Sequence, residues 1–310
     1  MNNITVLQGD VLTRGITEDL YSRFIKYLDA TPKTVETYTR ALRQLFLYFS
    51  RHGIVQPRRE DVMAFRDWLK DTGHKPTTVQ NYITVTRLFF RWTEQEGLYP
   101  NVAEHVKGAK IDRAHKKDNL TSRQVKDVLE GMDTERLKGL RDYAILTLMV
   151  TGGLRTIEVI RADIGDFGTL GDDTVLYLQG KGRDEKTEYI KIRANTEKAI
   201  RAYLSARGAV EESEPLFASV ANRNKGKRLT TRSVSRLAKY NLVEAGYSSE
   251  RLTAHSFRHT AVTLSLLAGN SLEEVQQFAR HENISTTMIY NHALEMSKNQ
   301  CSETIEQAIF

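Results

Sequence analysis

The apolar residues between Thr17 and Gly97 recur at helical spacing, in four segments separated by glycine and proline. The last three of these segments stop at Gly53, Gly73 and Gly97, and glycine is the residue that most often follows the end of a helix. A short amphipathic helix must bury its apolar face against another element. The sequence therefore predicts a helical bundle at the front of the chain. Its apolar positions are Leu20, Phe24, Leu28, Val35, Tyr38, Leu42, Leu45, Phe46, Phe49, Val62, Phe65, Trp68, Leu69, Val79, Tyr82, Phe89 and Phe90.

The helical pattern breaks between Pro100 and Asn119, where lysine and arginine are frequent and apolar residues are few. We interpret this stretch as a basic linker between two domains. Such a linker could neutralise phosphates while two domains close around a duplex like a clamp, or it could be only a solvated connection. The expected division is a tail at 1–15, a helical domain at 16–107, the linker at 108–119, a second domain at 120–295 and a tail helix at 296–310.

The second domain begins with helical periodicity, changes to strand patterns and then returns to helices. A largely apolar helix is expected over Leu140–Val150. The β-rich runs Thr174–Leu178 and Thr187–Ile192 flank the glycine-rich, basic segment Gly180–Asp184, which predicts a hairpin with a basic tip. The fold class is therefore mainly α with a small β-sheet, an N-terminal helical bundle followed by an α+β domain.

Three helices are expected after residue 253. The first runs over Ala254–Leu267, and the second runs over Leu272–Ala279 behind a capping box formed by Ser271 and Glu274. The third should carry Tyr290 and be capped by Ser285. A further helix, Ser233–Leu242, is expected after a basic cluster in the same domain.

Composition restricts the partners and the compartment. The 45 Lys and Arg against 39 Asp and Glu give a net charge of +6, which favours an anionic partner. The single cysteine, Cys301, excludes an intramolecular disulfide and fits a reducing compartment. Residues 1–10 lack the pattern of a signal peptide, and no run approaches the roughly 18 apolar residues of a membrane span. We expect a cytoplasmic protein.

An ordered set of reactive residues lies near the C-terminus: His255-Ser-Phe-Arg258, Arg280-His281 and Tyr290. A tyrosine oxygen can cut a phosphodiester only when cations and hydrogen-bond donors surround the phosphate. An alternative is a zinc site, because His255 and His259 are spaced i, i+4. The general-base Glu of the HExxH pattern is missing and Arg258 lies between the two histidines, so no metal is predicted.

Together with Gly153-Leu-Arg155-Thr-Ile-Glu158 and Gly180-Lys181-Gly182, this set stands in the order of the tyrosine recombinase motifs. The chain resembles the short, Xer-type members of that family from about residue 16 to residue 295, as a core-binding domain followed by a catalytic domain. Tyr290 follows His281 by nine residues. Two positions depart from the family pattern: Arg280 stands where glycine is usual, and Gly152 stands where threonine is common.

The resemblance implies a role for each motif residue. Arg155 and Arg258 would grip the phosphate oxygens, with Glu158 orienting Arg155. Tyr290 would be the nucleophile, His255 its base and His281 a hydrogen-bond donor to the phosphate. Lys181, at the hairpin tip, would protonate the departing 5′ oxygen. Resealing through a phosphotyrosine needs no ATP, and Gly180-Lys181 lacks the rest of a phosphate-binding loop, so no cofactor is predicted.

Further basic residues are candidate DNA contacts, although each could equally be part of a solvated surface. They are Lys33, Arg40, Arg43, Lys75, Arg87, Arg91, Lys107, Lys110, Arg223, Lys225, Arg228 and Arg280, with Lys227 and Arg232 in the same cluster as Arg223. In the tail, Ile305, Ile309 and Phe310 fall on one side of a short helix, which in the family docks on a neighbouring protomer.

The function expected from this resemblance is site-specific recombination of double-stranded DNA with paired core sites, by a homotetramer that forms a 3′-phosphotyrosine intermediate, with accessory directionality factors as further partners. Integration, excision and resolution remain open, as does the DNA site. One alternative is a type IB topoisomerase, which usually lacks a histidine at the position of His255. Another is a non-catalytic DNA-binding repressor on the same scaffold, although a binder needs no nucleophile.

Overall fold

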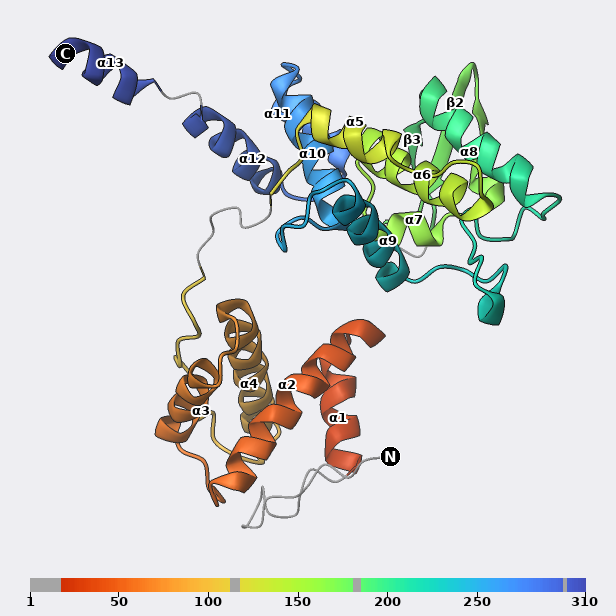
Figure 1. The fold of residues 1–310 in the computed structure, drawn as a ribbon. Helices are drawn as coiled ribbons and strands as arrows, with labels where there is room; N and C mark the ends of the chain where they lie inside the picture. Colours follow the sequence, from red (N-terminus) through yellow and green to blue (C-terminus); the bar gives the residue numbers. More distant parts are fainter. Residues whose placement is uncertain (1–17, 112–117, 181–184, 298–299) are drawn as a thin grey trace. The chain divides into compact units, whose positions relative to one another are not determined.

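The computed structural model describes residues 18–111, 118–180, 185–297 and 300–310, and the chain divides into two units near residue 113 (Figure 1). The division falls within the predicted basic linker. Lys181 and the residues 112–117 of that linker lie outside the described residues. No helix in the described part is long and apolar enough to cross a membrane.

The first unit is the predicted bundle of four helices: α1 (Glu18–Leu28), α2 (Pro32–Arg51), α3 (Arg59–Asp71) and α4 (Pro76–Gln95). Pro32 and Pro76 begin α2 and α4, where proline's fixed φ fits the first turn and its missing N–H is not needed. Gly53, Gly73 and Gly97 follow the ends of α2, α3 and α4 with φ of 63°, 79° and 67°, a conformation that glycine adopts without steric cost. Helix α4 contacts the other three helices.

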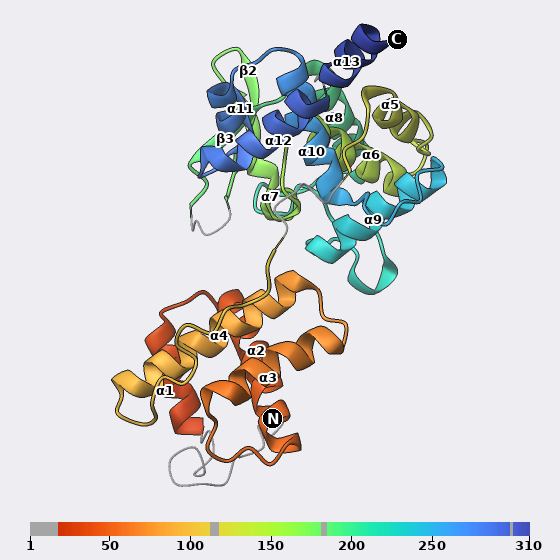
Figure 2. The same cartoon turned by 90° about the vertical axis from the view of Figure 1, so that its left-hand side faces the viewer.

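The second unit is a helical domain with a small sheet on one side (Figure 2). Helices α8, α9 and α10 pack against α6, whose residues Ile145 and Leu148 are fully buried. Its helices are α5 (Ser122–Glu130), α6 (Leu137–Thr151), α7 (Thr156–Arg161), α8 (Ala194–Arg207), α9 (Thr231–Glu244), α10 (Ala254–Leu267), α11 (Leu272–Ala279), α12 (Ile284–Ser297) and α13 (Cys301–Ile309), with 3₁₀ turns at Ile164–Asp166 and Asn222–Asn224.

The sheet has three antiparallel strands in the order β1 (Phe167–Leu170), β2 (Asp173–Leu178) and β3 (Glu188–Lys191). The β2–β3 pair is the predicted hairpin, with Leu176 opposite Ile190. Strand β1 was not predicted from the sequence; it pairs with β2 through a tight turn that places Leu170 opposite Asp173. Gly171 in that turn has φ of 60°, and Gly-Asp between two strands is a hairpin signal that could have revealed β1.

The last helices position the residues of the C-terminal motifs. Helices α10 and α11 run over the predicted ranges, and the capping box of Ser271 and Glu274 is present. Helix α12 packs against both α10 and α11, so that Tyr290 joins a small apolar cluster with Val262 and Val275. The prediction that Ser285 caps α12 is wrong. Asn283 Oδ1 accepts from the Ser285 backbone N–H at 2.8 Å, because the helix has already begun at Ile284.

Candidate active site

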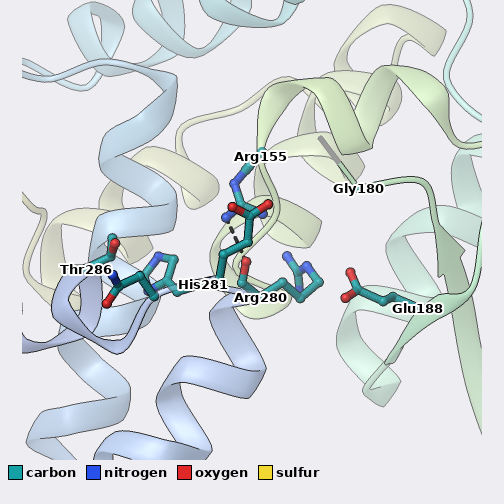
Figure 3. Close-up of a pocket in the computed structure, with 8 residues that line it drawn as sticks. Arg155, Gly180, Glu188, Arg280, His281 and Thr286 are labelled. Carbon is teal, nitrogen blue, oxygen red and sulfur yellow. Dashed lines mark hydrogen bonds between the residues drawn. The ribbon is translucent and has the colours of Figure 1, made fainter. Parts of the chain in front are cut away.

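A pocket of about 280 Å³ lies where the end of α11, the start of α7 and the β2–β3 hairpin meet. Its lining includes Arg155, Arg280, His281 and Thr286, with Gly180 and Glu188 from the hairpin (Figure 3). The predicted residues Arg155 and His281 therefore line the same pocket. Arg280, which precedes His281, lies 125 residues after Arg155 in the sequence. Lys181, which directly follows Gly180, is not described.

Arg155 is held from two directions. Its Nη1 donates to Glu158 Oε1 at 2.8 Å, one turn along α7, and its Nη2 donates to the backbone oxygen of Arg280 at 2.8 Å. Its side chain keeps 25% of its surface exposed. An arginine has five N–H donors, and these two contacts account for two of them. The guanidinium is thus fixed in orientation while part of its surface faces the pocket.

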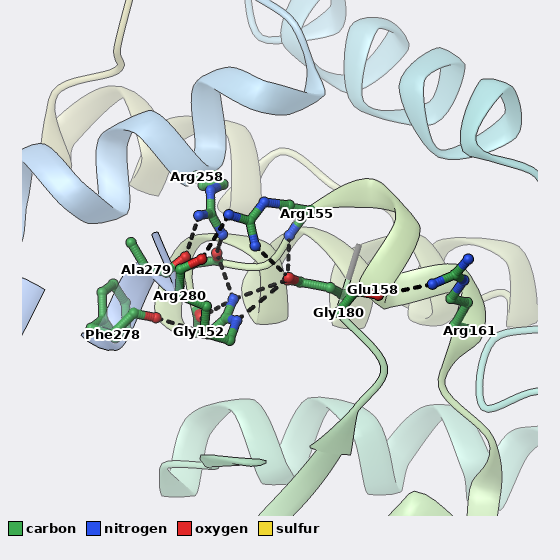
Figure 4. Close-up of polar contacts among 10 residues, drawn as sticks. Gly152, Arg155, Glu158, Arg161, Gly180, Arg258, Phe278, Ala279 and Arg280 are labelled. Carbon is green, nitrogen blue, oxygen red and sulfur yellow. Dashed lines mark hydrogen bonds and ion pairs between the residues drawn. The ribbon is translucent and has the colours of Figure 1, made fainter. Parts of the chain in front are cut away.

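Glu158 is fully buried and carries the negative charge beneath this site. Burial raises the pKa of its carboxyl, but the charge and hydrogen bond of Arg280, the backbone N–H of Arg155 and the charge of Arg258 together lower that pKa below its ordinary value. Figure 4 shows the three guanidinium groups gathered around the turn that Glu158 anchors. The carboxylate is therefore ionised, and it offsets one of three nearby positive charges.

Arg258 projects from α10 into the same cluster and is 4% exposed. Its Nη1 donates to the Gly153 carbonyl at 2.5 Å, and its Nη2 donates to the Ala279 carbonyl. Burial, and then the charge of Arg155, lower the pKa of Arg258 to about 9. The group remains charged at neutral pH, and it ties the loop after α6 to the end of α11.

Tyr290 lies between two imidazole rings. Its ring stacks at 15° to that of His281 with centroids 6.3 Å apart, and its hydroxyl contacts Nδ1 of His259. Tyr290 is 7% exposed, and burial raises the pKa of its phenol to about 12, although the charges of Arg258 and Arg155 act in the opposite direction. The phenol is protonated at neutral pH and needs a base to react as a nucleophile.

His281 is 8% exposed, and its Nδ1 lies 2.9 Å from Thr287 Oγ1. Burial, followed by the charges of Arg258, Arg155 and Arg280, lowers its pKa to about 4. The ring is therefore neutral at pH 7. If Thr287 donates its hydroxyl hydrogen to Nδ1, the ring hydrogen sits on Nε2, where it is available to a phosphate.

Two features of the site escaped the sequence analysis. His259, considered there only as half of a zinc pair, touches the tyrosine hydroxyl, whereas His255 is exposed in the first turn of α10. The i, i+4 spacing places both histidines on one face of the helix. This shared face was the feature of the sequence that could have made His259 a second candidate for the site. The role of Thr287 behind His281 had no comparable signal in the sequence.

The candidate DNA contacts fall into two groups. Lys33 and Arg40 are exposed and share Glu36 in surface ion pairs, and most of the others are also exposed. Arg228 is bound to Asp163 and donates to the Ile160 carbonyl at 2.8 Å. Arg280 has only 7% of its side chain exposed and faces Glu158 and backbone carbonyls. Both arginines thus bond to groups of the protein itself, although Arg228 keeps 39% of its side chain exposed and Arg280 does not.

Comparisons with known proteins identify the family of the chain and agree with its fold. Residues 118–296 match the phage integrase family, and residues 19–98 match the phage integrase N-terminal SAM-like domain. The tyrosine recombinase XerC of Herpetosiphon aurantiacus is 31% identical over 87% of this chain and 89% of its own length. A tyrosine recombinase of Synechococcus elongatus is 25% identical over 90% of both chains.

Solved structures share the fold at lower sequence identity. XerH recombinase bound to a palindromic difH substrate has a TM-score of 0.73 and 20% identity, covering 94% of this chain and 87% of that one. Lambda integrase bound to a core site has a TM-score of 0.68 and 17% identity, covering 86% and 94%. These relatives do not favour the topoisomerase or repressor alternatives. The chain belongs to the phage integrase family of tyrosine recombinases and is an enzyme that cleaves and rejoins DNA.

Proposed function

We propose that Tyr290 is the nucleophile of this recombinase and that Arg155, Arg258 and His281 hold the scissile phosphate. The supporting observation is the position of the Tyr290 hydroxyl against His259, beside a neutral His281 and two fixed guanidinium groups. A buried arginine cluster stabilises the charge that develops on phosphate oxygens, because little water remains to screen it.

The reaction proceeds in two balanced transfers. The Tyr290 oxygen attacks phosphorus while its proton passes to a histidine, and the bond between phosphorus and the 5′ oxygen breaks to leave a 3′-phosphotyrosyl link. The departing 5′ oxygen takes a proton from a general acid, for which Lys181 is the candidate. A 5′ hydroxyl of the partner strand then attacks the link and gives its proton to the group that had served as general acid. The Tyr290 oxygen leaves and takes back the proton held by the histidine. The phosphodiester energy is conserved throughout, so no nucleotide cofactor is required.

Two histidines compete for the role of base. The family resemblance assigns His255, and the contact with Tyr290 favours His259. Both belong to α10 and are one turn apart, so either ring could exchange a proton with the site when DNA is present. Their separate contributions are open to direct measurement.

The assembly that we propose is a homotetramer on double-stranded DNA with paired core sites, working in the cytoplasm where such DNA lies. Three apolar residues near the end of the chain support protomer contact: Ile305, Ile309 and Phe310 are 58%, 67% and 100% exposed. Apolar groups so exposed on one short helix are typical of an interaction surface. Exposed cations such as Arg43 and Lys75 support phosphate contact by the first unit.

A suicide substrate with a nick near the scissile phosphate tests the nucleophile. The wild type should accumulate a denaturant-resistant protein–DNA adduct, because the short 5′ fragment diffuses away. Tyr290→Phe should abolish the adduct and retain DNA binding. The control is Tyr240→Phe, since Tyr240 is 55% exposed on α9 away from the pocket and should leave the adduct unchanged. An adduct that survives Tyr290→Phe would overturn the assignment.

A further inference from the structure

Arg280 occupies a backbone conformation that suits glycine. It follows the end of α11 with φ of 52° and ψ of 48°, in the left-handed region. In the described part of the chain the other non-glycine residues with positive φ are Asp29 and His105. Aspartate and histidine are among the types enriched in that region, and arginine is not. A long side chain at this position costs conformational energy, so its own contacts must offset that cost.

Those contacts join the end of α11 to the loop after α6 and to α7, which lie more than 120 residues earlier in the sequence. The guanidinium of Arg280 donates to the Phe278 carbonyl at 2.8 Å, to the Gly153 carbonyl at 2.9 Å and to Glu158 Oε2 at 2.9 Å (Figure 4). The first contact closes the end of α11, the second holds the loop after α6, and the third engages the carboxylate on α7. The planar fork of arginine can make these contacts together, which an ammonium cannot.

The backbone of the same residue touches the catalytic cluster directly. The Arg280 carbonyl accepts from Arg155 Nη2 at 2.8 Å, and the next residue is His281. Glu158 meanwhile accepts from Arg155 at Oε1 and from Arg280 at Oε2. Arg155 is therefore oriented twice through Arg280, once by its backbone oxygen and once by the carboxylate that the two arginines share.

We propose that Arg280 is a positioning residue, whose buried guanidinium fixes Glu158 and the turn that holds Arg155. Arg155 and His281 are thereby kept in the orientation in which both contact the scissile phosphate. The proposal rests on the proposed function of Arg155 and His281. It replaces the expectation that Arg280 contacts DNA, because a side chain that is 7% exposed and bonded at three places faces the protein interior.

The decisive variant is Arg280→Gly, which suits the left-handed backbone and removes the side chain with its guanidinium. Saturating DNA binding and its salt dependence should be unchanged. Single-turnover cleavage should fall by about 10- to 100-fold, the scale on which small misplacements of catalytic groups act. A matched control is Arg201→Gln, which removes an arginine that pairs with Glu197 at 2.7 Å on the exposed surface of α8 and should cleave at the wild-type rate.

The pH profile separates positioning from a merely structural role. The charged groups that face Glu158 are Arg155 on its own helix, Arg258 from α10 and Arg280 at the end of α11, with His281 beside them. Without Arg280, burial of Glu158 is less compensated, so the carboxyl should protonate at a higher pH than in the wild type. Cleavage by Arg280→Gly should therefore decline toward acid pH earlier than wild-type cleavage does. In a Glu158→Gln background, removing Arg280 should no longer move the profile.

Each result bears on one proposal. Loss of the adduct in Tyr290→Phe with wild-type cleavage by Arg280→Gly would overturn positioning and leave the nucleophile intact. Weaker binding, a shallower salt slope and full cleavage at saturating DNA would assign Arg280 to DNA contact instead. If Arg280→Gly fails to fold, Arg280→Lys decides. Lysine keeps a positive charge near Glu158 but lacks the planar guanidinium. We therefore expect slower cleavage whose decline toward acid pH matches that of the wild type. An unchanged cleavage rate would overturn the proposal.

Discussion

The hydroxyl of Tyr290 lies in hydrogen-bond contact with Nδ1 of His259, and both groups come from helices that pack on one another. The ring of a second histidine, His281, stacks with the ring of Tyr290 and is neutral at pH 7. The tyrosine is thus oriented by histidines while its raised pKa keeps it protonated. The Tyr290 hydroxyl must therefore give its proton to an acceptor before its oxygen can react.

His259→Gln should lower the rate of adduct formation by roughly 100-fold, the usual scale for loss of a general base. Replacing Tyr290 by a fluorinated tyrosine of lower phenol pKa should restore much of that loss, since an acidic phenol needs less help to ionise. Single-turnover kinetics on the suicide substrate measure both. His255→Gln is the matched comparison. If the fluorinated tyrosine restored the rate of His255→Gln but not that of His259→Gln, His255 would be the base.

Arg258→Lys should lower cleavage by about 100- to 1000-fold, as expected when one preorganised donor to a developing oxyanion is lost. It should also lower thermal stability, because the Gly153 and Ala279 carbonyls lose their donors inside the protein. The control is Arg141→Lys, at another buried arginine, which donates to the Ala218 carbonyl at 3.1 Å. Equal rate losses in both variants would show that cleavage follows stability alone.

His281 should make the folded chain sensitive to acid. Its pKa of about 4 lies below the 6.5 of an ordinary histidine, so its stabilising contribution is present above pH 6.5 and is lost as the pH falls toward 4. Comparing thermal unfolding of the wild type and His281→Gln between pH 7 and pH 4 should show the wild type losing about 1–3 kcal/mol more. Parallel curves over that range would contradict the burial of a neutral ring.

Exposed cations of the first unit should set the salt dependence of DNA binding. Each phosphate contact contributes roughly −0.9 to the slope of log affinity against log salt, so Arg43→Gln or Lys75→Gln should reduce the slope by about one. Arg228→Gln should instead lower stability with the slope unchanged, because Arg228 is engaged by Asp163 and the Ile160 carbonyl. Fluorescence anisotropy at several salt concentrations distinguishes the two outcomes.

Removing residues 301–310 should leave cleavage of a single core site intact and abolish synapsis of two sites. The deletion removes α13 with the exposed Ile305 and Ile309, which make the proposed protomer contact. Native gels with paired-site DNA separate the monomer, dimer and tetramer complexes. Normal synapsis by the shortened chain would place the protomer contact elsewhere.

The helices of the first unit were predictable because local rules decide them: apolar spacing sets the buried face, and a glycine with positive φ ends each of α2, α3 and α4. The strand β1 was missed because its residues after Phe167 are exposed, so no alternation of buried and exposed positions marks it. Strand pairing, rather than its own pattern, makes β1 a strand.

The residue types of the site were predictable from motif order, and so was the pairing of Arg155 with Glu158, but the long-range partners were not. Arg280 is charged and follows a helix, which favours a surface location, and its bond to Glu158 spans 122 residues of sequence. His259 and Tyr290 are likewise 31 residues apart and meet only because α12 packs on α10. Contacts of this kind depend on tertiary packing that no local pattern encodes.

The packing of α12 onto α10 and α11 also bears on how the protein is made. Translation delivers Arg155 and Arg258, which we propose hold the phosphate, before it delivers α12 and Tyr290. A chain that terminates early, before residue 290, has no oxygen with which to open a strand by this route. Under the proposed mechanism, incomplete synthesis of this enzyme therefore yields a chain that keeps the cations of its first unit but lacks the proposed nucleophile.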